Sequence, residues 1–396
     1  MLRQFICYAS IGSLVFFTGW QPCYAEDSSY LENRVIEISA GAYHTVALKE
    51  DGTVWSWGNQ NFESTDDYDE EQSCNSKAEQ VESLEDIKAI AAGYHHVVAL
   101  KEDGTVWSWG NNVFGQLGHT DFVVRNNQPM MVVDLKDVKA IAAGEWHTVA
   151  LKEDGSIWAW GDNEDGQLGD GRVIATNKPV QAIDIEEVVA IASGNCFTVA
   201  LKQDGTVWTW GLYFYYDPIE NVDIAMTSTQ PVCKEGIEDV KAIAAGSDHV
   251  VALKEDGTVW GWGSNFAGQL GAIVIADSDT NNEFKYERFM QVSGMEKVKA
   301  IAAGYNYTIA LKKDGSLWVW GRNNLGNLGD DSIETISIEP VPVKDLEDVI
   351  AVSAADDHIV ALKKDGTVWS WGLNLYGQLG DGTVMYTSKP VQTKIK

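Results

Sequence analysis

The chain has 396 residues, with 29 Lys and Arg against 58 Asp and Glu, so its formal charge is −29. A charge of this sign repels phosphate backbones and anionic lipid surfaces, which argues against nucleic acid as a partner and is compatible with simple solubility or with a basic protein partner. Hydrophobic residues make up 45% of the chain, and its 37 Gly and 16 Trp indicate many tight turns and large packed rings rather than disorder.

The first 25 residues have the pattern of a signal peptide. Arg3 precedes an apolar run over residues 5–20, and the small side chain of Ala25 marks a cleavage site before Glu26. We expect export to a secreted, periplasmic or cell-surface location. No later apolar run is long enough to span a bilayer, so no membrane insertion is expected after signal removal. A short lead over residues 26–33 then precedes a repeat domain over residues 34–396.

Three cysteines remain after removal of the signal peptide, and these are Cys74, Cys196 and Cys233. Their spacing matches no metal-ligand pattern, and their odd number indicates that folding does not depend on disulfides. One bridge with one thiol left over is compatible with an oxidising compartment, so the sequence leaves their pairing open.

One phrase returns seven times along the repeat domain. Its second copy begins at Gly93, passes through His96 and the Asp103-Gly104 dipeptide, and ends in Trp-Ser-Trp-Gly at Gly110. The phrase recurs about every 50 residues, a period typical of propeller blades. Its first position is occupied by Gly41, Gly93, Gly144, Gly194, Gly246, Gly304 and, in the last copy, Ala355.

Each part of the phrase predicts a structural element. The apolar runs on either side of Asp-Gly predict two antiparallel strands joined by a tight turn, in which the glycine takes a positive φ. The two Trp of Trp-x-Trp share one face of their strand and are expected to pack between blades. Five copies continue with Gly-x-Leu-Gly, which lacks the Lys-Ser/Thr of a nucleotide loop and predicts a turn. Pro-Val segments such as residues 179–180 predict short outer strands.

The combination of Gly-x-x-His, Ala-Leu-Lys-x-Asp-Gly, Trp-x-Trp-Gly and Gly-Gln-Leu-Gly resembles the regulator-of-chromosome-condensation repeat family over residues 34–396. The resemblance implies an all-β fold, a seven-bladed β-propeller with four-stranded blades, closed between residues 34–40 and 389–396. Members of that family include a nuclear exchange factor for a small GTPase, ubiquitin-ligase modules and an exported bacterial inhibitor of β-lactamase. This chain is distantly similar to that inhibitor, but the fold does not fix the function.

The resemblance further implies that one face of the ring binds the partner, through the two residues between the repeat Gly and the repeat His. These positions mix aromatic rings with carboxylates, and rigid aromatic side chains suit a protein-binding surface. The predicted partner-binding residues at these positions are Tyr43, Tyr94, His95, Trp146, Asp248, Tyr305, Asp356 and Asp357.

Three inserts interrupt the regular phrase, and loops on a rigid scaffold often carry binding residues. Residues 63–71 are acidic but lack calcium-loop spacing, so a solvated charge run is expected. Residues 272–297 form a surface excursion without an assigned role. The third insert is a run of aromatic residues that is either a partner anchor or a plug packed against the ring. It adds Tyr213, Phe214, Tyr215 and Tyr216 to the predicted partner-binding residues.

The repeat histidines are expected to be structural, because copies four and six replace them with Phe197 and Tyr307, which a metal site or catalytic ring would not tolerate. No other catalytic, cofactor or metal motif stands out. The sequence therefore predicts an exported, non-enzymatic, monomeric scaffold that binds a protein of unknown identity without a cofactor. The alternatives are a guanine-nucleotide exchange factor for a small GTPase and an inhibitor of an extracytoplasmic enzyme such as a β-lactamase.

Overall fold

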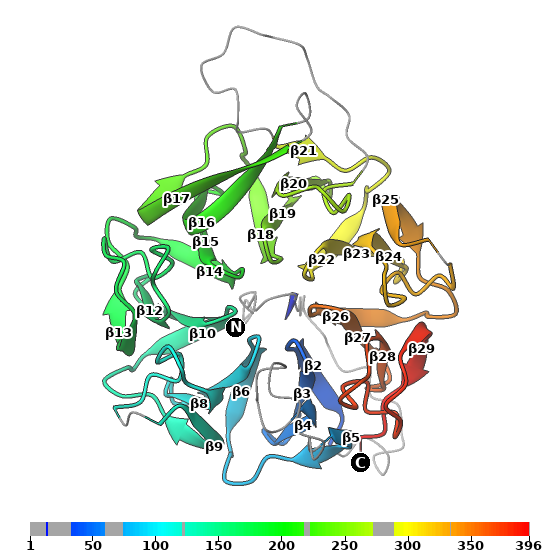
Figure 1. Cartoon of the computed structure of the whole chain (residues 1–396), viewed down its shortest axis with the longest axis horizontal. Helices are drawn as coiled ribbons and strands as arrows, with labels where there is room; N and C mark the ends of the chain where they lie inside the picture. The colour runs from blue at the N-terminus through cyan, green and yellow to red at the C-terminus, as the bar shows by residue number, and fades with distance from the viewer. Residues whose placement is uncertain are drawn as a thin grey trace, which may run out of the picture.

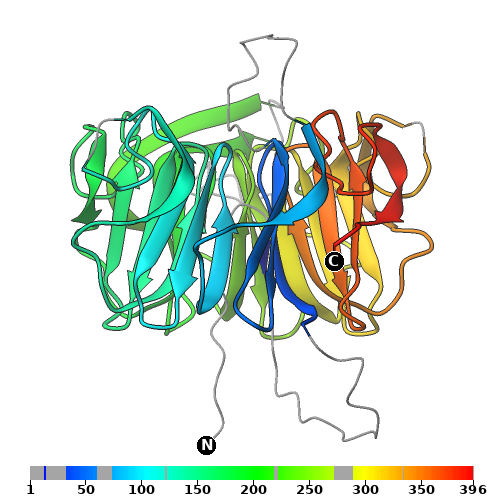
Figure 2. The same ribbon diagram turned by 90° about the horizontal axis from the view of Figure 1, so that it is seen from below.

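The computed structural model describes residues 13–14, 33–59, 74–120, 123–217, 222–271, 289–332 and 334–395. Seven antiparallel sheets stand around a central axis like the blades of a propeller (Figure 1), and in side view they form a ring with two loop-bearing faces (Figure 2). Each blade has four strands numbered outward from the axis, which confirms the predicted fold. Within the described residues there is no helix long and apolar enough to cross a membrane.

The first four blades are consecutive along the chain. Blade 1 holds β2 (Val35–Ala40), β3 (His44–Lys49), β4 (Val54–Asn59) and β5 (Cys74–Gln80). Blade 2 holds β6 (Ile87–Ala92), β7 (His96–Lys101), β8 (Val106–Asn111) and β9 (Arg125–Met131). Blade 3 holds β10 (Val138–Ala143), β11 (His147–Lys152), β12 (Ile157–Gly161) and β13 (Thr176–Gln181). Blade 4 holds β14 (Val188–Ser193), β15 (Phe197–Lys202), β16 (Val207–Asp217) and β17 (Val222–Cys233).

The last three blades complete the ring. Blade 5 holds β18 (Val240–Ala245), β19 (His249–Lys254), β20 (Val259–Gly263) and β21 (Met290–Gln291). Blade 6 holds β22 (Val298–Ala303), β23 (Tyr307–Lys312), β24 (Leu317–Arg322) and β25 (Ile336–Pro342). Blade 7 holds β26 (Val349–Ala354), β27 (His358–Lys363), β28 (Val368–Gly372) and β29 (Thr387–Gln392). A short strand, β1 (Ser13–Leu14), pairs with the inner edge of β26.

The Asp-Gly dipeptides form the tight turns that the sequence predicts. In blade 3, Gly155 has a φ of 84°, a value that glycine adopts at little cost. Asp154 accepts hydrogen bonds from the backbone N–H and the hydroxyl of Ser156 (2.9 and 2.6 Å). The same hydroxyl accepts a hydrogen bond from the indole N–H of Trp158 (3.2 Å). The turn therefore also orients the first Trp of the Trp-x-Trp pair.

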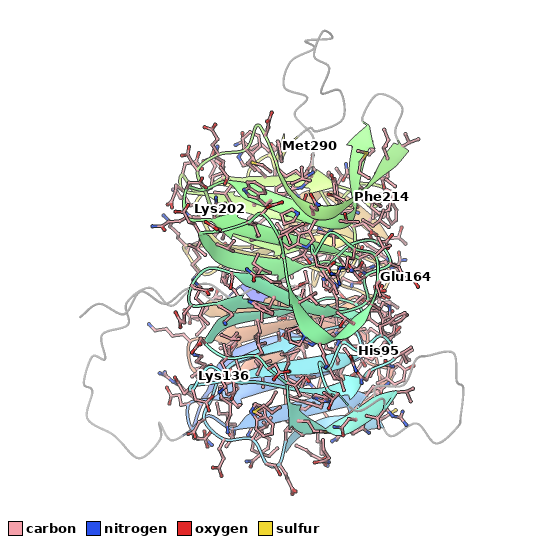
Figure 3. All side chains as sticks on the ribbon, turned by 90° about the vertical axis from the view of Figure 1, so that its left-hand side faces the viewer. His95, Lys136, Glu164, Lys202, Phe214 and Met290 are labelled. Atoms are coloured by element: carbon pink, nitrogen blue, oxygen red, sulfur yellow. The ribbon has the colours of Figure 1, made fainter. Side chains whose placement is uncertain are left out.

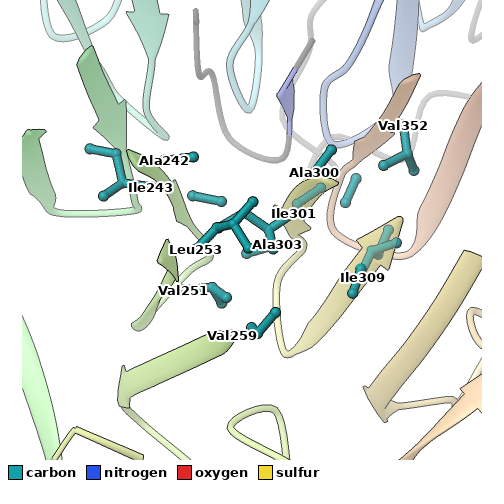
Figure 4. Packing of buried hydrophobic residues seen from close by; sticks show 14 of the residues in the cluster. Ala242, Ile243, Val251, Leu253, Val259, Ala300, Ile301, Ala303, Ile309 and Val352 are labelled. Atoms are coloured by element: carbon teal, nitrogen blue, oxygen red, sulfur yellow. The ribbon is translucent and has the colours of Figure 1, made fainter. Parts of the chain in front are cut away.

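The second Trp of each pair fills the space between two blades, as predicted. Trp160 is fully buried and belongs to one hydrophobic cluster with Leu100 and Val106 of blade 2 and with Val138 and Ile141 of its own blade. Aliphatic side chains complete the packing between neighbouring inner and second strands, as Figure 4 shows for blades 5 to 7. Burial of rings of this size at every junction stabilises the radial arrangement of the sheets.

A recurring set of hydrogen bonds, here called the blade clasp, joins a histidine of one blade to the next blade. The ring Nε2 of His147 lies 3.1 Å from Thr198 Oγ1, and Thr198 donates to the carbonyl oxygen of Gln167 (2.8 Å). Trp210 donates to the same carbonyl oxygen (2.9 Å). Since the hydroxyl proton of Thr198 is used on the carbonyl, Nε2 carries a hydrogen and donates to the threonine.

The blade clasp explains which copies carry histidine. The same clasp is made by His96 with Thr148, His249 with Thr308, and His358 with Thr45. Where Phe197 or Tyr307 replaces the histidine, the following blade carries Val250 or Ile359 in place of threonine. The expectation of structural histidines is therefore confirmed for the four clasps. Blades 1 and 2 combine a histidine, His44, with Val97.

Loss of one clasp hydroxyl is expected to cost about 1–3 kcal/mol, because the buried N–H of His147 loses its acceptor in a Thr198→Val variant. Adding His147→Phe removes that donor and copies the Phe197 and Val250 pair of the next junction. The double variant should therefore be more stable than the single Thr198→Val variant, as measured by urea unfolding. If the double variant loses as much free energy of unfolding as the two single variants lose together, the histidine and threonine of the clasp do not act as a unit.

Blades 1 and 7 close the ring as complete four-stranded sheets. The backbone N–H of Ala40 in β2 donates to the hydroxyl of Ser353 in β26 (2.9 Å). Val35 and Ala40 share one apolar cluster with Val360 and with Ile395 near the other end of the chain. Both segments expected at the closure thus contribute to this junction by packing, while each blade keeps its own strands.

Candidate functional site

The loops after the first and third strands of every blade open on one face of the ring, here called the loop face. In blade 2, Asn111 N donates to His95 O (2.8 Å), and in blade 3, Asp162 N donates to Trp146 O (2.9 Å), so the two loops of a blade are joined. Figure 3 shows His95 on this side of the ring and Lys136 on the opposite side. All predicted partner-binding positions between the repeat Gly and the repeat His therefore lie on the loop face.

Six aromatic side chains from four adjacent blades form a continuous aromatic cluster on the loop face. The ring centroids of Tyr43 and Tyr94 are 5.8 Å apart in an edge-on arrangement, and those of Tyr94 and Trp146 are 6.2 Å apart. The cluster continues from Trp146 to Phe114 (5.4 Å) and from Tyr43 to Tyr376 of blade 7 (5.0 Å). Its members are Tyr43, Tyr94, His95, Phe114, Trp146 and Tyr376.

Two members of the aromatic cluster were not predicted and one has a different role. Phe114 and Tyr376 directly precede the first glycine of Gly-x-Leu-Gly in their blades, a motif that the sequence analysis treated only as a turn. His95 is 4% exposed and lies beneath the cluster, with its ring 4.6 Å from Tyr94 and 5.4 Å from Trp146. Burial lowers the pKa of His95 to about 4. The expectation that His95 itself contacts a partner is corrected: it supports the rings that are half-buried.

Carboxyl groups from three blades gather beside the aromatic cluster. Burial raises the pKa of Asp356 to about 8, with repulsion from Asp357 and Glu145 adding to the shift. Burial likewise raises the pKa of Glu145, and repulsion from Asp248 raises it further. Backbone hydrogen bonds join these loops from blade to blade, from Tyr94 N to Gly144 O (3.3 Å) and from Tyr305 N to Ala355 O (3.2 Å), so the loops that carry the carboxyls form one continuous inner rim of the loop face. We call Glu145, Asp248 and Asp356 the mouth carboxyls.

Two tyrosines and one arginine lie beside the mouth carboxyls, and together these residues form what we call the mouth of the ring. Asp356 is hydrogen-bonded to the Tyr94 hydroxyl, which links the mouth carboxyls to the aromatic cluster. The pKa of Tyr305 is raised by burial and by all three mouth carboxyls. Arg322 forms an ion pair with Asp357 (3.8 Å). The structure thus brings Asp248, Tyr305, Asp356 and Asp357 together as predicted positions of one face, and it adds Glu145.

The aromatic run of residues 213–216 belongs to an extended hairpin of β16 and β17. Tyr213 is 7% exposed, and the ammonium of Lys234 lies 3.8 Å from its ring centroid. Its expected role as a partner contact is therefore corrected in favour of a packed plug. Phe214 is half-buried and pairs with Ala225. Tyr215 pairs with Ile224 through the backbone, and its side chain lies outside the described part.

Two pockets border the loop face. Tyr216 is half-buried and, with Phe266 and Ile338, lines a pocket of about 380 Å³ over blades 4 to 6. A second pocket of about 450 Å³ is lined by Phe114 and Val124, and Val124 is 71% exposed. Phe114 therefore connects the aromatic cluster to an apolar pocket between blades 2 and 3.

The remaining sequence expectations have separate outcomes. The acidic insert of residues 63–71 lies outside the described residues, as does most of the excursion of residues 272–297. Among the described residues, Cys74, Cys196 and Cys233 are not joined by disulfide bonds. In the described ranges, no group of three or more His, Cys, Asp or Glu side chains is arranged to hold a metal ion.

The chain is a repeat propeller of seven blades. The residues that differ between the repeat copies, between the repeat Gly and the repeat His, lie together on its loop face. The chain belongs to the RCC1-like domain family, whose model matches residues 19–216 and 175–396. It is 29% identical over 376 residues to the Ultraviolet-B receptor UVR8 of Arabidopsis thaliana, which covers 93% of this chain and 72% of that protein.

Other relatives differ in the function their names state. The chain is 30% identical over 329 residues to the secretion-regulating guanine nucleotide exchange factor of Mus musculus, covering 77% of this chain but only 60% of that protein. Yeast RCC1 (Prp20), solved bound to Kap60, superposes with a TM-score of 0.70 at 20% identity, covering 96% of this chain and 91% of the other. At that identity the likeness shows the fold alone.

Proposed function

We propose that this chain is an exported, non-enzymatic propeller that binds a protein partner through its loop face. The observation that carries the proposal is the aromatic cluster, in which half-buried rings from four blades are held in mutual contact. Rings fixed in this way lose little side-chain freedom on binding and contribute large contact areas. Relatives in the same fold bind proteins: the solved structures include yeast RCC1 with Kap60, and Prp20p was characterised for binding to Gsp1p and histones.

Removal of the half-buried rings of the loop face is expected to weaken partner binding. In a pull-down with the mature chain, a Tyr43→Ala, Tyr94→Ala, Trp146→Ala and Tyr305→Ala variant should retain the partner at least about tenfold more weakly, as for loss of interface hot spots. A Glu102→Ala, Glu153→Ala and Glu255→Ala variant is the control, because these exposed side chains lie beside the Asp-Gly turns on the opposite face of the ring. A partner that stays bound to the quadruple variant would refute the use of this face.

Export of the chain can be tested independently of partner binding. The mature protein is expected to begin at Glu26 and to be recovered outside the cytoplasm, which mass spectrometry of the N-terminus tests directly. An N-terminus that retains residues 1–25 on a cytoplasmic protein would contradict this part of the proposal.

A guanine-nucleotide exchange factor is the second candidate, favoured by the similarity to the secretion-regulating exchange factor. An exchange factor accelerates release of a labelled nucleotide from a small GTPase at substoichiometric concentration. We expect no acceleration in a screen of small GTPases that includes the preferred GTPases of related propellers. Accelerated release that depends on the loop face would establish exchange activity in place of a scaffold role.

A further inference from the structure

The mouth of the ring combines negative charge with aromatic rings, and this combination defines the chemistry of its occupant. We infer that the partner places an arginine or lysine side chain over the ring axis, among the carboxyl groups of Glu145, Asp248 and Asp356 and beside Tyr94 and Tyr305. The inference rests on the proposed protein-binding function, and it specifies which kind of partner segment the loop face recognises.

The first argument is the incomplete compensation of charge. Asp356 and Glu145 act on each other across the ring, and Tyr305 feels all three mouth carboxyls. Arg322 is engaged in an ion pair with Asp357 (3.8 Å). The pKa of Asp356 is raised to about 8, mainly by burial and further by repulsion from Asp357 and Glu145, so this carboxyl holds its proton at neutral pH. A cation bound at this point would favour the carboxylate form of Asp356 and offset the repulsion between the mouth carboxyls.

The second argument is the aromatic surroundings of these carboxyls. Tyr94 contacts Asp356 through its hydroxyl, while its ring packs against Tyr43 and Trp146. A guanidinium or ammonium group near such rings gains cation–π attraction in addition to its ion pairs. The chain itself stacks lysine ammonium groups on aromatic rings elsewhere, as with Lys49 over Trp55 (4.2 Å) and Lys234 over Tyr213 (3.8 Å).

The third argument is the cost of covering the mouth with a neutral surface. An apolar partner that seals the loop face would remove water from three carboxyl groups without replacing it, which is unfavourable. A cationic side chain replaces the lost hydration, and the formal charge of −29 attracts such a partner over longer distances. The aromatic cluster then supplies contact area around a central ion pair.

A displayed library of random twelve-residue peptides, selected on the immobilised full mature chain, tests the inference. We expect enriched peptides to share an arginine or lysine at a fixed position relative to an apolar residue. The affinity of a synthetic copy should fall at least about tenfold for the Glu145→Gln, Asp248→Asn and Asp356→Asn variant, as for loss of a buried charge pair.

Non-specific attraction to an acidic protein is controlled by a variant with the same change of charge on the opposite face. Glu102, Glu153 and Glu255 are exposed beside the Asp-Gly turns, and their replacement with glutamine should leave peptide affinity within about twofold, since exposed charges are screened. Replacement of the cationic residue of the peptide with glutamine gives the same test without altering the protein. It therefore holds even if the mouth variant fails to fold.

The possible results separate the two proposals. Enriched peptides that lack a cationic residue, but lose affinity for the Tyr43, Tyr94 and Trp146 alanine variant, would overturn the cationic inference and leave the proposed function standing. Enriched peptides that bind this aromatic variant as well as the wild type would overturn the proposed use of the loop face. An absence of enrichment above background would count against both.

Discussion

Acidification from pH 6.5 toward pH 4.5 is expected to destabilise this propeller by several kcal/mol through its buried histidines. Burial lowers the pKa of each clasp histidine to about 3, and it also lowers the pKa of the buried His44 and His95. The clasp histidines are His96, His147, His249 and His358. In each of these four the ring Nδ1 has no hydrogen-bond partner among the described residues, so a proton there would be buried without an acceptor.

The direction of this pH effect on stability follows from the pKa of each histidine in the folded and in the unfolded chain. A histidine with a lower pKa in the folded chain binds its proton more readily when unfolded, so its stabilising effect is complete above pH 6.5. That effect is lost as the pH falls from 6.5 toward 3, by up to about 1.4 kcal/mol per pH unit for each histidine. Glu37 and Asp356 oppose this trend, because burial raises the pKa of each to about 8 and the folded state holds their protons. Burial also raises the pKa of other carboxyls, which oppose the trend in the same direction: Glu145, Asp162, Asp248 and Asp357. We expect the six histidines to outweigh these carboxyls.

Urea unfolding at pH 7.0, 6.0 and 5.0 measures the effect, which can be assigned with variants. A chain carrying His96→Phe with Thr148→Val and His147→Phe with Thr198→Val lacks two titrating rings but keeps the apolar pairing found elsewhere in the ring. Its free energy of unfolding should fall less steeply with acid, by about 1.4 kcal/mol per pH unit for each histidine removed. Equal slopes for this variant and the wild type would show that these histidines are not the cause.

The repeating parts of the fold could be predicted because their chemistry is local and occurs seven times. Asp154, Gly155 and Ser156 form their turn within three consecutive residues, and Trp158 and Trp160 share a face through strand periodicity alone. The blade clasp was not predicted, since it joins His147 to a threonine 51 residues later. Its signal was nevertheless present in the sequence, because His96, His147 and His249 are each followed about one repeat later by threonine, whereas Phe197 and Tyr307 are followed by valine or isoleucine.

The site was predicted less completely because it depends on which side chains meet in space. Tyr43, Tyr94 and Trp146 occupy positions that the family resemblance indicates, and their rings do form one cluster. Of the two roles that the sequence left open for Tyr213, its burial favours the packed plug, because residues 213–216 extend a strand rather than form a loop. Side chains along a strand alternate between its two faces, and Tyr213 points inward under Lys234.

Replacing Gly161 with alanine is expected to be among the most damaging single changes in blade 3. Gly161 has a φ of 108°, which is costly for any residue with a Cβ atom. A Cβ there would lie 2.4 Å from the carbonyl oxygen of Trp146 and 2.8 Å from the Cα of His147. Strain and the clash with backbone atoms together should lower the free energy of unfolding by about 3 kcal/mol or more.

Gly294→Ala separates these two causes, because Gly294 also has a positive φ of 73° but no atom lies within 4 Å of its added Cβ. That control should lose only about 1–2 kcal/mol, the cost of the backbone conformation alone. The comparison bears on function, since Gly161 ends the Trp-x-Trp-Gly phrase and lies directly against the loop that carries Trp146. A chain with Gly161→Ala that remains folded should displace Trp146 and weaken partner binding, whereas folded Gly294→Ala should bind normally. Equal losses of stability for the two variants would mean that close approach to the Trp146 loop is not what the repeat glycine provides.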